Sequence, residues 1–351
     1  MRILVTGGAG YIGSHTCVEL LAAGHEVVIV DSLVNASPRA VAAIEAAAGR
    51  SVIFHQFDIR DHERLRAMFA TEGIDAVFHF AALKAVAESV SDPLRYFDNN
   101  IGGTVTLART AVAAGVNLFV FSSSATVYGV PKRVPVAETA PLAAINPYGR
   151  SKLFDEQILT DLQAAQPDMR IALLRYFNPG GAHPSGLIGE DPRNEPENLL
   201  PCVARVAAGR MPRLRIHGGD WPTPDGTGVR DFIHVVDVAG GHIAALDALL
   251  AGRGPVADGQ VLTVNLGTGR GYSVLEVVRA FGDVVGHPIA HEIGPRRAGD
   301  VAACYADTQL AEKLLGWRAQ FGLEAICRDA WRWQTTHPDG HDTPAPTPVM
   351  A

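Results

Sequence analysis

Cysteine is scarce in this chain, with four cysteines among 351 residues. They lie far apart, at Cys17, Cys202, Cys304 and Cys327, without the close spacing of a metal-binding motif. This pattern excludes a disulfide-rich secreted scaffold and indicates reduced thiols in a cytoplasmic protein. The thirteen histidines form no zinc-like cluster either, so we expect no catalytic metal.

Positive charge is also in short supply. The chain has 30 Lys and Arg residues against 37 Asp and Glu residues, and its net charge of −7 disfavours nucleic-acid or anionic-membrane partners. No charged and apolar leader precedes the first apolar segment, Arg2–Thr6, so no signal peptide is visible. No uninterrupted apolar run reaches membrane-spanning length, and we expect no membrane partner.

Strand and helix patterns alternate through the first half of the chain. Short apolar strands are expected at Arg2–Thr6, Glu26–Val30, Val52–Gln56, Asp75–Phe80, Leu118–Ser122 and Ile171–Arg175. Helices are expected at Ser14–Ala23, Pro38–Ala48, His62–Thr71, Pro93–Ala114 and Tyr148–Ala165. This alternation predicts an α/β fold with a doubly wound, Rossmann-like parallel sheet.

Glycine marks a nucleotide site after the first strand. Gly7, Gly10 and Gly13 have the spacing G-x-x-G-x-x-G between a strand and a helix. Such glycines permit a tight turn and let backbone amides approach a pyrophosphate at the helix N-terminus. The second strand leads to Asp31, whose carboxylate can accept from the adenosine ribose and would repel a 2′-phosphate. The motif therefore predicts NAD as the cofactor.

The composition changes after Asn178, where Gly and Pro become frequent and the alternation of strands and helices becomes irregular. We expect an NAD-binding domain over residues 1–178 and a smaller α/β substrate domain over 179–338. Residues around 230–242 are expected to return to the first domain, because Asp231–Asp237 looks like a strand that leads into a helix. Residues 339–351, rich in Pro, Thr, Asp and His, are expected to form a disordered tail.

Tyr148 and Lys152 are four residues apart in a helix expected to begin after Pro147. Positions i and i+4 share one helix face, so the ammonium can sit beside the phenol. A free phenol, with a pKa of about 10, is a poor base, and a neighbouring cation lowers that pKa toward the working range. The pair predicts a general acid–base group, although a surface helix with an incidental Tyr and Lys has the same pattern.

Three serines, Ser122–Ser124, follow the apolar strand that begins at Leu118. Ligands of doubly wound folds sit at the carboxyl ends of strands. Ser124 lies furthest beyond the strand, so we expect it to hydrogen-bond a substrate hydroxyl and help pass its proton to Tyr148. Ser122 and Ser123 are expected to form a capped turn.

Several long motifs together resemble the extended short-chain dehydrogenase/reductase superfamily. They are the glycine loop, Ser122–Gly129, the Tyr148/Lys152 pair and Arg175–Pro179. More narrowly, the chain up to its tail resembles the UDP-glucose 4-epimerase family, through Phe80–Val86, Asp98–Asn100 and Gly226–Asp231. The resemblance implies interconversion of UDP-glucose and UDP-galactose at C4, through a 4-keto intermediate and with tightly bound NAD.

The resemblance also implies residue roles. Tyr148 removes the sugar 4-OH proton, through or alongside Ser124, and Lys152 keeps the phenol acidic and binds the nicotinamide ribose. Cofactor contacts are implied for Gly7, Gly10, Tyr11, Ile12, Gly13, Asp31, Ser32, Asn35, Asp58, Ile59, Phe80, Ala81, Lys84, Asn99, Ser124, Tyr148, Lys152 and Phe177. Contacts to the UDP-sugar are implied for Lys84, Ser124, Tyr148, Asn178, Asn198, Leu199, Arg230, Arg297, Asp300 and Cys304. Asp58 could instead cap the helix that follows it.

Cys304 departs from one pattern in the family. Relatives restricted to glucose and galactose carry Tyr at this position, whereas relatives that accept N-acetylated sugars carry a small residue. A thiol leaves room beside the sugar C2 substituent, so we expect UDP-GlcNAc and UDP-GalNAc to be interconverted as well, unless Tyr305 swings into that space. A cysteine that fills a core gap is compatible with this expectation.

Other functions of the same fold would require different residues. A nucleotide-sugar 4,6-dehydratase places Asp-Glu before Val-Tyr-Gly, where this chain has Ala125-Thr126. A UDP-glucuronate decarboxylase or epimerase needs a site for a C6 carboxylate, and sequence alone does not exclude one. A non-catalytic NAD-binding scaffold typically loses the Tyr or the Lys, and both are present here.

The resemblance further implies a homodimer. The family usually pairs two helices of the sheet domain, which here are Pro93–Ala114 and Ser151–Ala165. The apolar content of both helices fits such an interface, and core packing explains it equally well.

Overall fold

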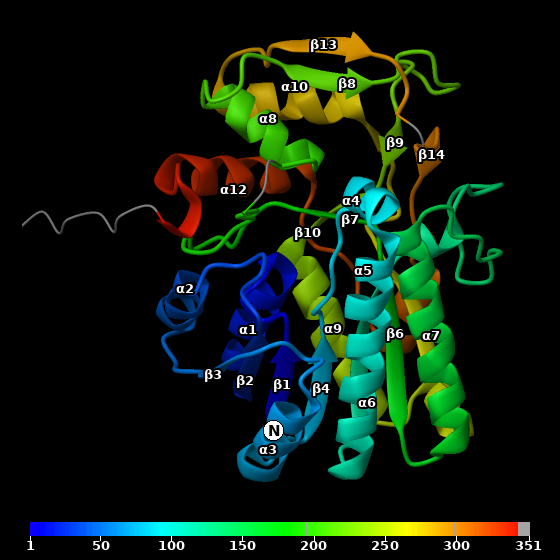
Figure 1. Cartoon of the computed structure of the whole chain (residues 1–351). Coiled ribbons are helices and arrows are strands. Elements are labelled where there is room, and N and C mark those ends of the chain that lie inside the picture. The colour runs from blue at the N-terminus through cyan, green and yellow to red at the C-terminus, as the bar shows by residue number, and fades with distance from the viewer. Residues whose placement is uncertain (194–195, 298, 343–351) are drawn as a thin grey trace, which may run out of the picture.

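A seven-stranded parallel sheet organises the first part of the chain in the computed structural model, which describes residues 1–193, 196–297 and 299–342 (Figure 1). The strand order is β11-β6-β5-β4-β1-β2-β3. The strands are β1 (Arg2–Thr6), β2 (Glu26–Asp31), β3 (Ile53–Gln56), β4 (Ala76–His79), β5 (Leu118–Ser124), β6 (Arg170–Tyr176) and β11 (Leu262–Leu266). The predicted doubly wound sheet is confirmed.

The order of the strands reverses at β1. Leu4 of β1 pairs with Val28 of β2 on one side and with Val77 of β4 on the other. Open α/β sheets bind ligands where the order reverses, beyond the carboxyl ends of the strands. The site is therefore expected beyond Thr6 and His79, the last residues of β1 and β4.

Helices cover both faces of the sheet, and each face has its own apolar core. On one face α1 (Tyr11–Ala22) packs against α2 (Arg39–Ala48) and α9 (Val235–Leu250), and α9 packs against α11 (Gln309–Leu315). On the other face α6 (Gly103–Ala113) packs against α3 (His62–Glu72) and α7 (Pro147–Ala165). Because both faces are covered, all seven residues of β5 are buried.

The helix expected over Pro93–Ala114 is present but not uniform. A π-helical turn at Asp98–Gly102 joins α5 (Pro93–Phe97) to α6. Such turns are rare and are frequent at functional sites. This one carries Asn99, an expected cofactor contact, and its neighbour Asn100.

The second part of the chain lies at one end of the sheet, at the top of Figure 1. Its helices are α8 (Leu199–Ala207), α10 (Val274–Val285) and α12 (Leu323–Thr336), and they share a separate core. Its strand pairs are β8 (Leu214–His217) with β13 (His291–Gly294), and β7 (Asn178–Gly180) with β10 (Phe232–His234). A small sheet places β9 (Val229–Arg230) between β12 (Tyr272–Ser273) and β14 (Ala303–Cys304).

The return of the chain to the large sheet is longer than the sequence predicted. The strand and helix expected near residues 230–242 are β10 and α9. Of these two elements, β10 pairs with β7 outside the large sheet. It is β11 that joins the large sheet, pairing Leu262 with Ala172 of β6, and α11 packs against β11. Its short apolar run lies outside the regular alternation, so the sequence pattern did not assign it. Of the expected tail, residues 340–342 form a short helical turn, and residues 343–351 lie outside the described part.

One helical stretch passes a membrane-span test of length and mean composition, although Asp237 and Asp247 interrupt its apolar run. The stretch Val235–Asp258, which contains α9, is long and apolar enough to cross a membrane. Its apolar character has another explanation, because α9 packs against α1 and against β5 and β6 of the sheet. We therefore interpret it as a core helix.

Candidate active site

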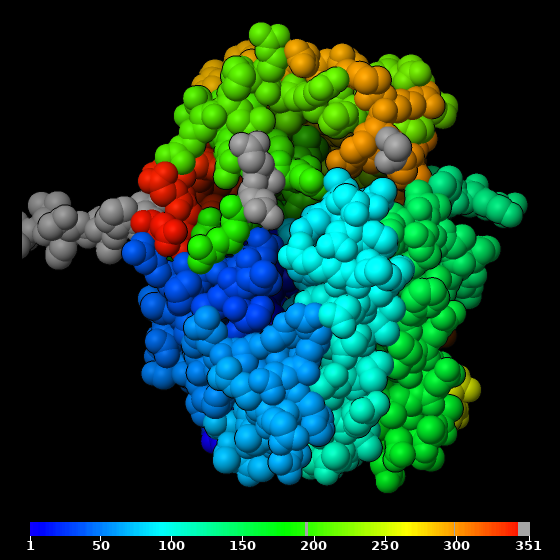
Figure 2. All heavy atoms as spheres, in the orientation of Figure 1, coloured from blue at the N-terminus to red at the C-terminus, as the bar shows by residue number. Residues whose placement is uncertain are grey.

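Several predicted site residues follow the carboxyl ends of the central strands. Gly7 follows β1, Phe80 and Ala81 follow β4, Ser124 ends β5 and Phe177 follows β6. Figure 2 shows the surface hollowed here, between the blue N-terminal segments and the cyan helices α4 (Val86–Ser91) and α5. The fold therefore brings together residues that are far apart in the sequence.

The glycine loop has no room for larger residues at Gly7 and Gly13, and the backbone of Gly7 adopts a left-handed conformation. Gly7 has φ +70°, and a Cβ there would lie 2.7 Å from the amide nitrogen of Ala81. A Cβ on Gly13 would lie 2.2 Å from the carbonyl oxygen of Gly7. Gly10 caps α1 without any side-chain hydrogen bond, so the first amides of α1 keep their donors for an anion. This cradle fits a pyrophosphate.

Tyr11 and Ile12 hold the first turn of α1 in place. The Tyr11 hydroxyl donates to the carbonyl oxygen of Gly181, 2.7 Å away, and so ties α1 to the second part of the chain. Ile12 packs against the apolar core on the α1 face. Their backbone amides, at the start of the helix, are the groups that face an anion.

Asp31 is buried beside the glycine loop at the end of β2. Its two carboxylate oxygens accept from the amides of Ala9 and Leu33, at 3.1 and 2.9 Å. Burial raises the pKa of Asp31, and these two hydrogen bonds oppose the rise. Each oxygen keeps a further lone pair that a ribose hydroxyl can use. Ser32 and Asn35 follow on an exposed loop.

Asp58 does not cap the next helix. Asp61 is the N-cap of α3 and accepts from the amide of Arg64. The Asp58 carboxylate accepts from the side chain of Arg60, with 2.6 Å to Nη2, and this pairing lowers the pKa of Asp58. Ile59 is buried against α6. The capping alternative is therefore wrong, and the adenine contact stays a prediction.

Tyr148 lies in the first turn of α7. The helix begins at Pro147, one residue before the predicted start, and the Asn146 side chain accepts from the amide of Gly149 at 2.8 Å. The pKa of Tyr148 is raised, chiefly by burial of the phenol; a hydrogen bond with Ser124 opposes the rise, and the charge of Asp155 adds to it. The structure therefore does not show the lowering of the Tyr148 pKa that was expected from Lys152.

Lys152 is buried one turn further along α7, on the same face. Its ammonium donates to the carbonyl oxygen of Ser122 at 2.8 Å and lies 4.6 Å from the ring centroid of Phe121. Burial lowers the pKa of Lys152 to about 8, while Asp155 and Glu156 oppose this. The cation is thus held against β5 and is easily deprotonated for a lysine.

Ser124 ends β5 facing Tyr148. Its hydroxyl oxygen accepts from the amide and the hydroxyl of Thr126, at 3.2 and 3.0 Å. It also hydrogen-bonds the Tyr148 phenol. Ser122 and Ser123 have structural partners instead, in Tyr176 and Glu156. The arrangement can move a proton between a bound hydroxyl, Ser124 and Tyr148, which is general acid–base chemistry.

Lys84 has a carboxylate partner that the sequence analysis missed. Its ammonium lies 3.2 Å from an oxygen of Glu190, a mostly buried side chain. The same oxygen accepts from Nδ2 of Asn198 at 2.8 Å. Glu190 therefore links two predicted ligand contacts across the cleft. Lys84 and Glu190 are 106 positions apart, so no local sequence pattern predicts that they pair.

Asn100 is a second missed residue, and it supports the base of the Tyr148 helix. Its Nδ2 donates to the carbonyl oxygen of Leu83 and to the Ser151 hydroxyl, and its Oδ1 accepts from the amide of Leu83. The Ser151 hydroxyl donates in turn to the carbonyl oxygen of Tyr148. Asn99 next to it donates to Asn100. Two adjacent asparagines inside a helical pattern were the available signal.

Arg230, Arg297 and Asp300, which the resemblance assigns to the UDP-sugar, lie close together. Asp300 Oδ1 lies 3.2 Å from Arg297 Nη2 and 3.7 Å from Arg230 Nη2. Arg230 also donates to the carbonyl oxygen of Val301, and its burial lowers its pKa. Guanidinium groups of this kind suit a diphosphate. Asn178 is exposed on β7, and Leu199 begins α8.

Cys304 lies beside Arg230, with which it pairs between β14 and β9. It packs against the apolar cluster of Val127, Tyr128 and Phe177, and burial raises its pKa to about 11. Tyr305 next to it has its ring against Gly271, where a glycine Cβ would lie 2.9 Å from ring carbon Cδ1. Neighbouring residues of an extended strand face opposite sides, so Tyr305 does not fill the space beside Cys304.

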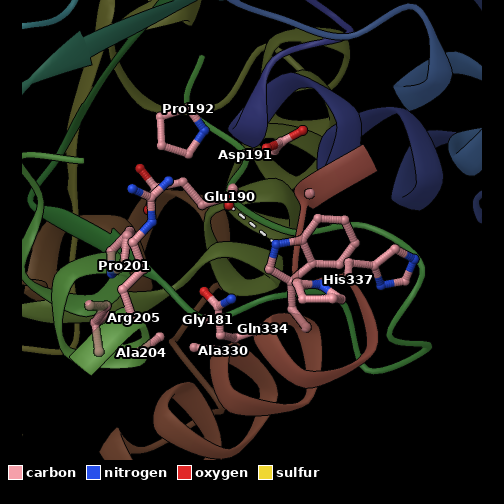
Figure 3. Close-up of a pocket in the computed structure, with 14 residues that line it drawn as sticks. Gly181, Glu190, Asp191, Pro192, Pro201, Ala204, Arg205, Ala330, Gln334 and His337 are labelled. Carbon is pink, nitrogen blue, oxygen red and sulfur yellow. Dashed lines mark hydrogen bonds between the residues drawn. The ribbon is translucent and has the colours of Figure 1, made fainter. Parts of the chain in front are cut away.

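A smaller pocket lies on the other side of Glu190, against α12 (Figure 3). Gly181, Ala204 and His337 are among the residues that line it, and Trp333 Nε1 donates to the carbonyl oxygen of Glu190 at 3.2 Å. Its volume of about 50 Å³ is far below the ~300–1,000 Å³ of ordinary ligand sites. The cleft beyond the sheet, where the predicted residues converge at the ends of the strands, is the candidate site. Among the described residues, no group of His, Cys, Asp and Glu could hold a metal ion.

Known proteins resemble this chain over nearly its whole length. Residues 3–264 match the model of the NAD dependent epimerase/dehydratase family. The UDP-glucose 4-epimerase of Bacillus subtilis (strain 168) is 53% identical over 97% of this chain and 99% of its own length.

Solved structures show the same likeness. The UDP-glucose 4-epimerase from Bifidobacterium longum, in complex with NAD+ and UDP, has a TM-score of 0.92 and 50% identity, covering 97% of this chain and all of its own. The UDP-glucose-4-epimerase from Stenotrophomonas maltophila, with bound NAD and formylated UDP-arabinopyranose, has a TM-score of 0.92 and 53% identity, covering 96% and 99%. The UDP-Glc/GlcNAc 4-epimerase from Campylobacter jejuni has a TM-score of 0.81 and 40% identity, covering 95% and 99%.

Proposed function

The chain belongs to the NAD dependent epimerase/dehydratase family, and we propose that it interconverts UDP-glucose and UDP-galactose by epimerisation at C4 with a tightly bound NAD. One observation carries the proposal. Tyr148, Ser124 and Lys152 converge at the carboxyl ends of the sheet strands, beside a glycine cradle that fits a pyrophosphate. This is an acid–base centre next to a dinucleotide site.

The protein's own residues would hold the dinucleotide along the cleft. The amides of Tyr11, Ile12 and Gly13 would bind the pyrophosphate, and Asp31 would bind the adenosine ribose. When bound, NAD supplies a reversible hydride acceptor for C4, and the positive charge of its oxidised nicotinamide favours the Tyr148 phenolate. Tyr148 takes and returns the proton of the 4-hydroxyl, with Ser124 in the same hydrogen-bonded path.

The nucleotide end of the substrate needs firm anchors, because the keto sugar must present both faces to one hydride site. Arg230 and Arg297 can bind diphosphate oxygens, and Asp300 between them can accept from the uridine ribose. Asn178, Asn198 and Leu199 complete this side of the cleft. None of these groups lies on the Tyr148 helix, so the anchor and the reacting centre are separate.

The test is conversion without added cofactor. Purified protein is incubated with equal UDP-galactose and UDP-GalNAc, and the anomeric protons are followed by NMR. Production of UDP-glucose without net NADH supports a self-contained epimerase. No conversion of UDP-galactose, with NAD confirmed in the protein, would overturn the function. Conversion of a UDP-glucuronate control instead would identify the decarboxylase or epimerase alternative.

We propose a second activity, the interconversion of UDP-GlcNAc and UDP-GalNAc. It is supported by the small Cys304 side chain beside Arg230 and Phe177, and by the position of the Tyr305 ring against Gly271. A larger C2 substituent then has space that a phenol at 304 would fill. The same NMR mixture tests it, because turnover of UDP-galactose alone would remove this activity and keep the first.

We also propose that the protein is a cytoplasmic homodimer. Val90, Leu94 and Phe154 are apolar yet 65%, 77% and 40% exposed, on the mutually packed helices α4, α5 and α7. Adjacent exposed apolar side chains favour a protein partner. Cys17, Cys304 and Cys327 are thiols without a disulfide, in keeping with a reducing compartment. Sedimentation of wild type and Leu94→Asp tests the dimer, since a monomeric wild type contradicts it.

A further inference from the structure

Asp155 is a buried acid that the proposed chemistry does not use. It lies on α7, three residues after Lys152 and seven after Tyr148, so all three share one stripe of the helix. Its side chain is 1% exposed, and neither carboxylate oxygen has a hydrogen-bond partner of ordinary geometry. Buried carboxylates are normally satisfied, so this one calls for an explanation.

Among the groups around Asp155, Lys152 is the cation whose charge acts on it. Glu156, the next residue, is already neutralised by Arg175 of β6. Thr104 of α6 faces Asp155, but its hydroxyl donates to the carbonyl oxygen of Asn100 at 2.8 Å. The Thr104 oxygen also contacts Nε2 of His79 at 3.0 Å. Burial lowers the pKa of His79 to about 3, so the ring is neutral and adds no charge.

The charges of Asp155, Lys152 and Tyr148 are coupled. Burial raises the pKa of Asp155 to about 7, although Lys152 and Thr104 pull it down. The carboxylate raises the pKa of Lys152 and also that of Tyr148. An ionised Asp155 therefore keeps the ammonium charged and disfavours the phenolate. Protonation of Asp155 removes the charge and therefore lowers the pKa of both Lys152 and Tyr148.

We propose that Asp155 is a positioning residue that sets the charge of Lys152 and tunes the Tyr148 acid–base group. The inference rests on the proposed function, since it assigns a role within the same site. Asp155 touches neither the reacting atoms nor the glycine cradle. It acts through its charge, on Lys152 one turn away and on Tyr148 further along the same helix stripe.

The test is the pH profile of Asp155→Asn against wild type, in the full-length protein with its NAD. Asp155 and Tyr148 are about 10 Å apart along the helix axis, where a unit charge at an effective dielectric of about 20 shifts a pKa by about one unit. We expect both limbs of the kcat profile to move to lower pH by up to about one unit. Asp161→Asn, on the exposed side of the same helix, is the matched control and should leave both limbs in place.

Two further measurements separate this role from a structural one. Asp155→Leu removes the charge without leaving a buried amide unpaired, and it should shift both limbs in the same direction. The near-ultraviolet absorbance of the Tyr148 phenolate, obtained as the difference from Tyr148→Phe, should titrate at lower pH in both Asp155 variants. This readout needs no turnover, so it tests Asp155 even where epimerisation fails. Lower activity with unmoved limbs, or an equal shift in Asp161→Asn, overturns the inference.

Discussion

Arg175 and Glu156 form a buried two-point ion pair directly behind the acid–base helix. Arg175 Nε lies 2.8 Å from Glu156 Oε1, and Nη2 lies 2.6 Å from Oε2, with both side chains about 95% buried. Glu156 comes from α7 and Arg175 from β6, so the pair fixes the helix to the sheet. Ser123 donates to the same carboxylate, and Arg175 also donates to Tyr128.

Removing one member of this pair should be strongly destabilising. Glu156→Gln leaves a buried guanidinium without its counter-charge, and such losses cost about 3–5 kcal/mol of unfolding free energy. Urea denaturation measures the change. Glu63→Gln breaks the exposed pair with Arg66 on α3 and should leave stability as it is. Equal effects of the two variants would mean that burial does not set the strength of the Arg175 pair.

Tyr148→Phe should remove proton transfer and little else. The phenol hydroxyl is the only atom lost, so we expect activity to fall by about 10²–10⁴-fold, the usual contribution of one acid–base group. NAD content and thermal stability should stay near wild type. Tyr96→Phe is the control, because its hydroxyl donates to Glu88 and Tyr96 is not among the predicted site residues. Comparable activity of the two variants would exclude Tyr148 as the acid–base group.

Gly13→Ala should disrupt the dinucleotide cradle. A Cβ at this position meets the carbonyl oxygen of Gly7 at 2.2 Å, and backbone cannot move aside cheaply. A displacement of about 1 Å in a positioning group can cost about 10²-fold in rate. We expect NAD loss on purification and activity lower by that order. Gly322→Ala, with no atom within 4 Å of the new Cβ, should retain both NAD and activity.

Much of the fold followed from local patterns in the sequence. β1 has the predicted bounds, and the helix of Tyr148 begins within one residue of its predicted start. Both depend on local signals, namely the strand alternation and the Asn146-Pro147 cap. The π turn at Asp98–Gly102 was missed, since helical periodicity does not report one extra residue in a turn. β11 was missed because its place beside β6 depends on pairing across the chain.

The residues of the candidate site also fall into two groups, those that local motifs predict and those that depend on distant contacts. Glycine spacing and the Tyr148/Lys152 pair are local motifs, and the structure brings both to one edge of the sheet. Glu190 and Asn100 act through partners that are distant in sequence, at Lys84 and Ser151. The motif also did not predict the direction of the Tyr148 pKa shift, because burial of the phenol raises the pKa and the Lys152 ammonium donates to the carbonyl oxygen of Ser122.

Acid should destabilise the protein partly through His79. The ring is 2% exposed, contacts Thr6 Oγ1 at 2.7 Å and Thr104 Oγ1 at 3.0 Å, and has a pKa lowered to about 3 by burial. The unfolded chain takes up a proton at about pH 6.5, while the folded chain does not until about pH 3. Stability is therefore lost as pH falls through this window, by up to about 1.4 kcal/mol per pH unit.

His79→Gln isolates that contribution. Urea denaturation of wild type and variant at about pH 8, where both histidine states are neutral, measures the packing loss alone. Toward lower pH the two stabilities should converge, because the variant lacks the proton uptake on unfolding. A constant difference across the pH range would show that His79 takes up no proton when the chain unfolds.

Cys304→Tyr should narrow the range of substrates without stopping catalysis. Cys304 faces the cluster with Phe177, and a phenol there would occupy the space beside the sugar C2 substituent. UDP-GalNAc turnover should fall by at least about tenfold, the effect of a modest steric change in a pocket, while UDP-galactose turnover stays within a few fold. Competition between the two substrates in one NMR sample measures the ratio directly. Cys304→Ser keeps a small side chain and should preserve both activities, so equal losses in both variants would tie Cys304 to packing and not to substrate choice.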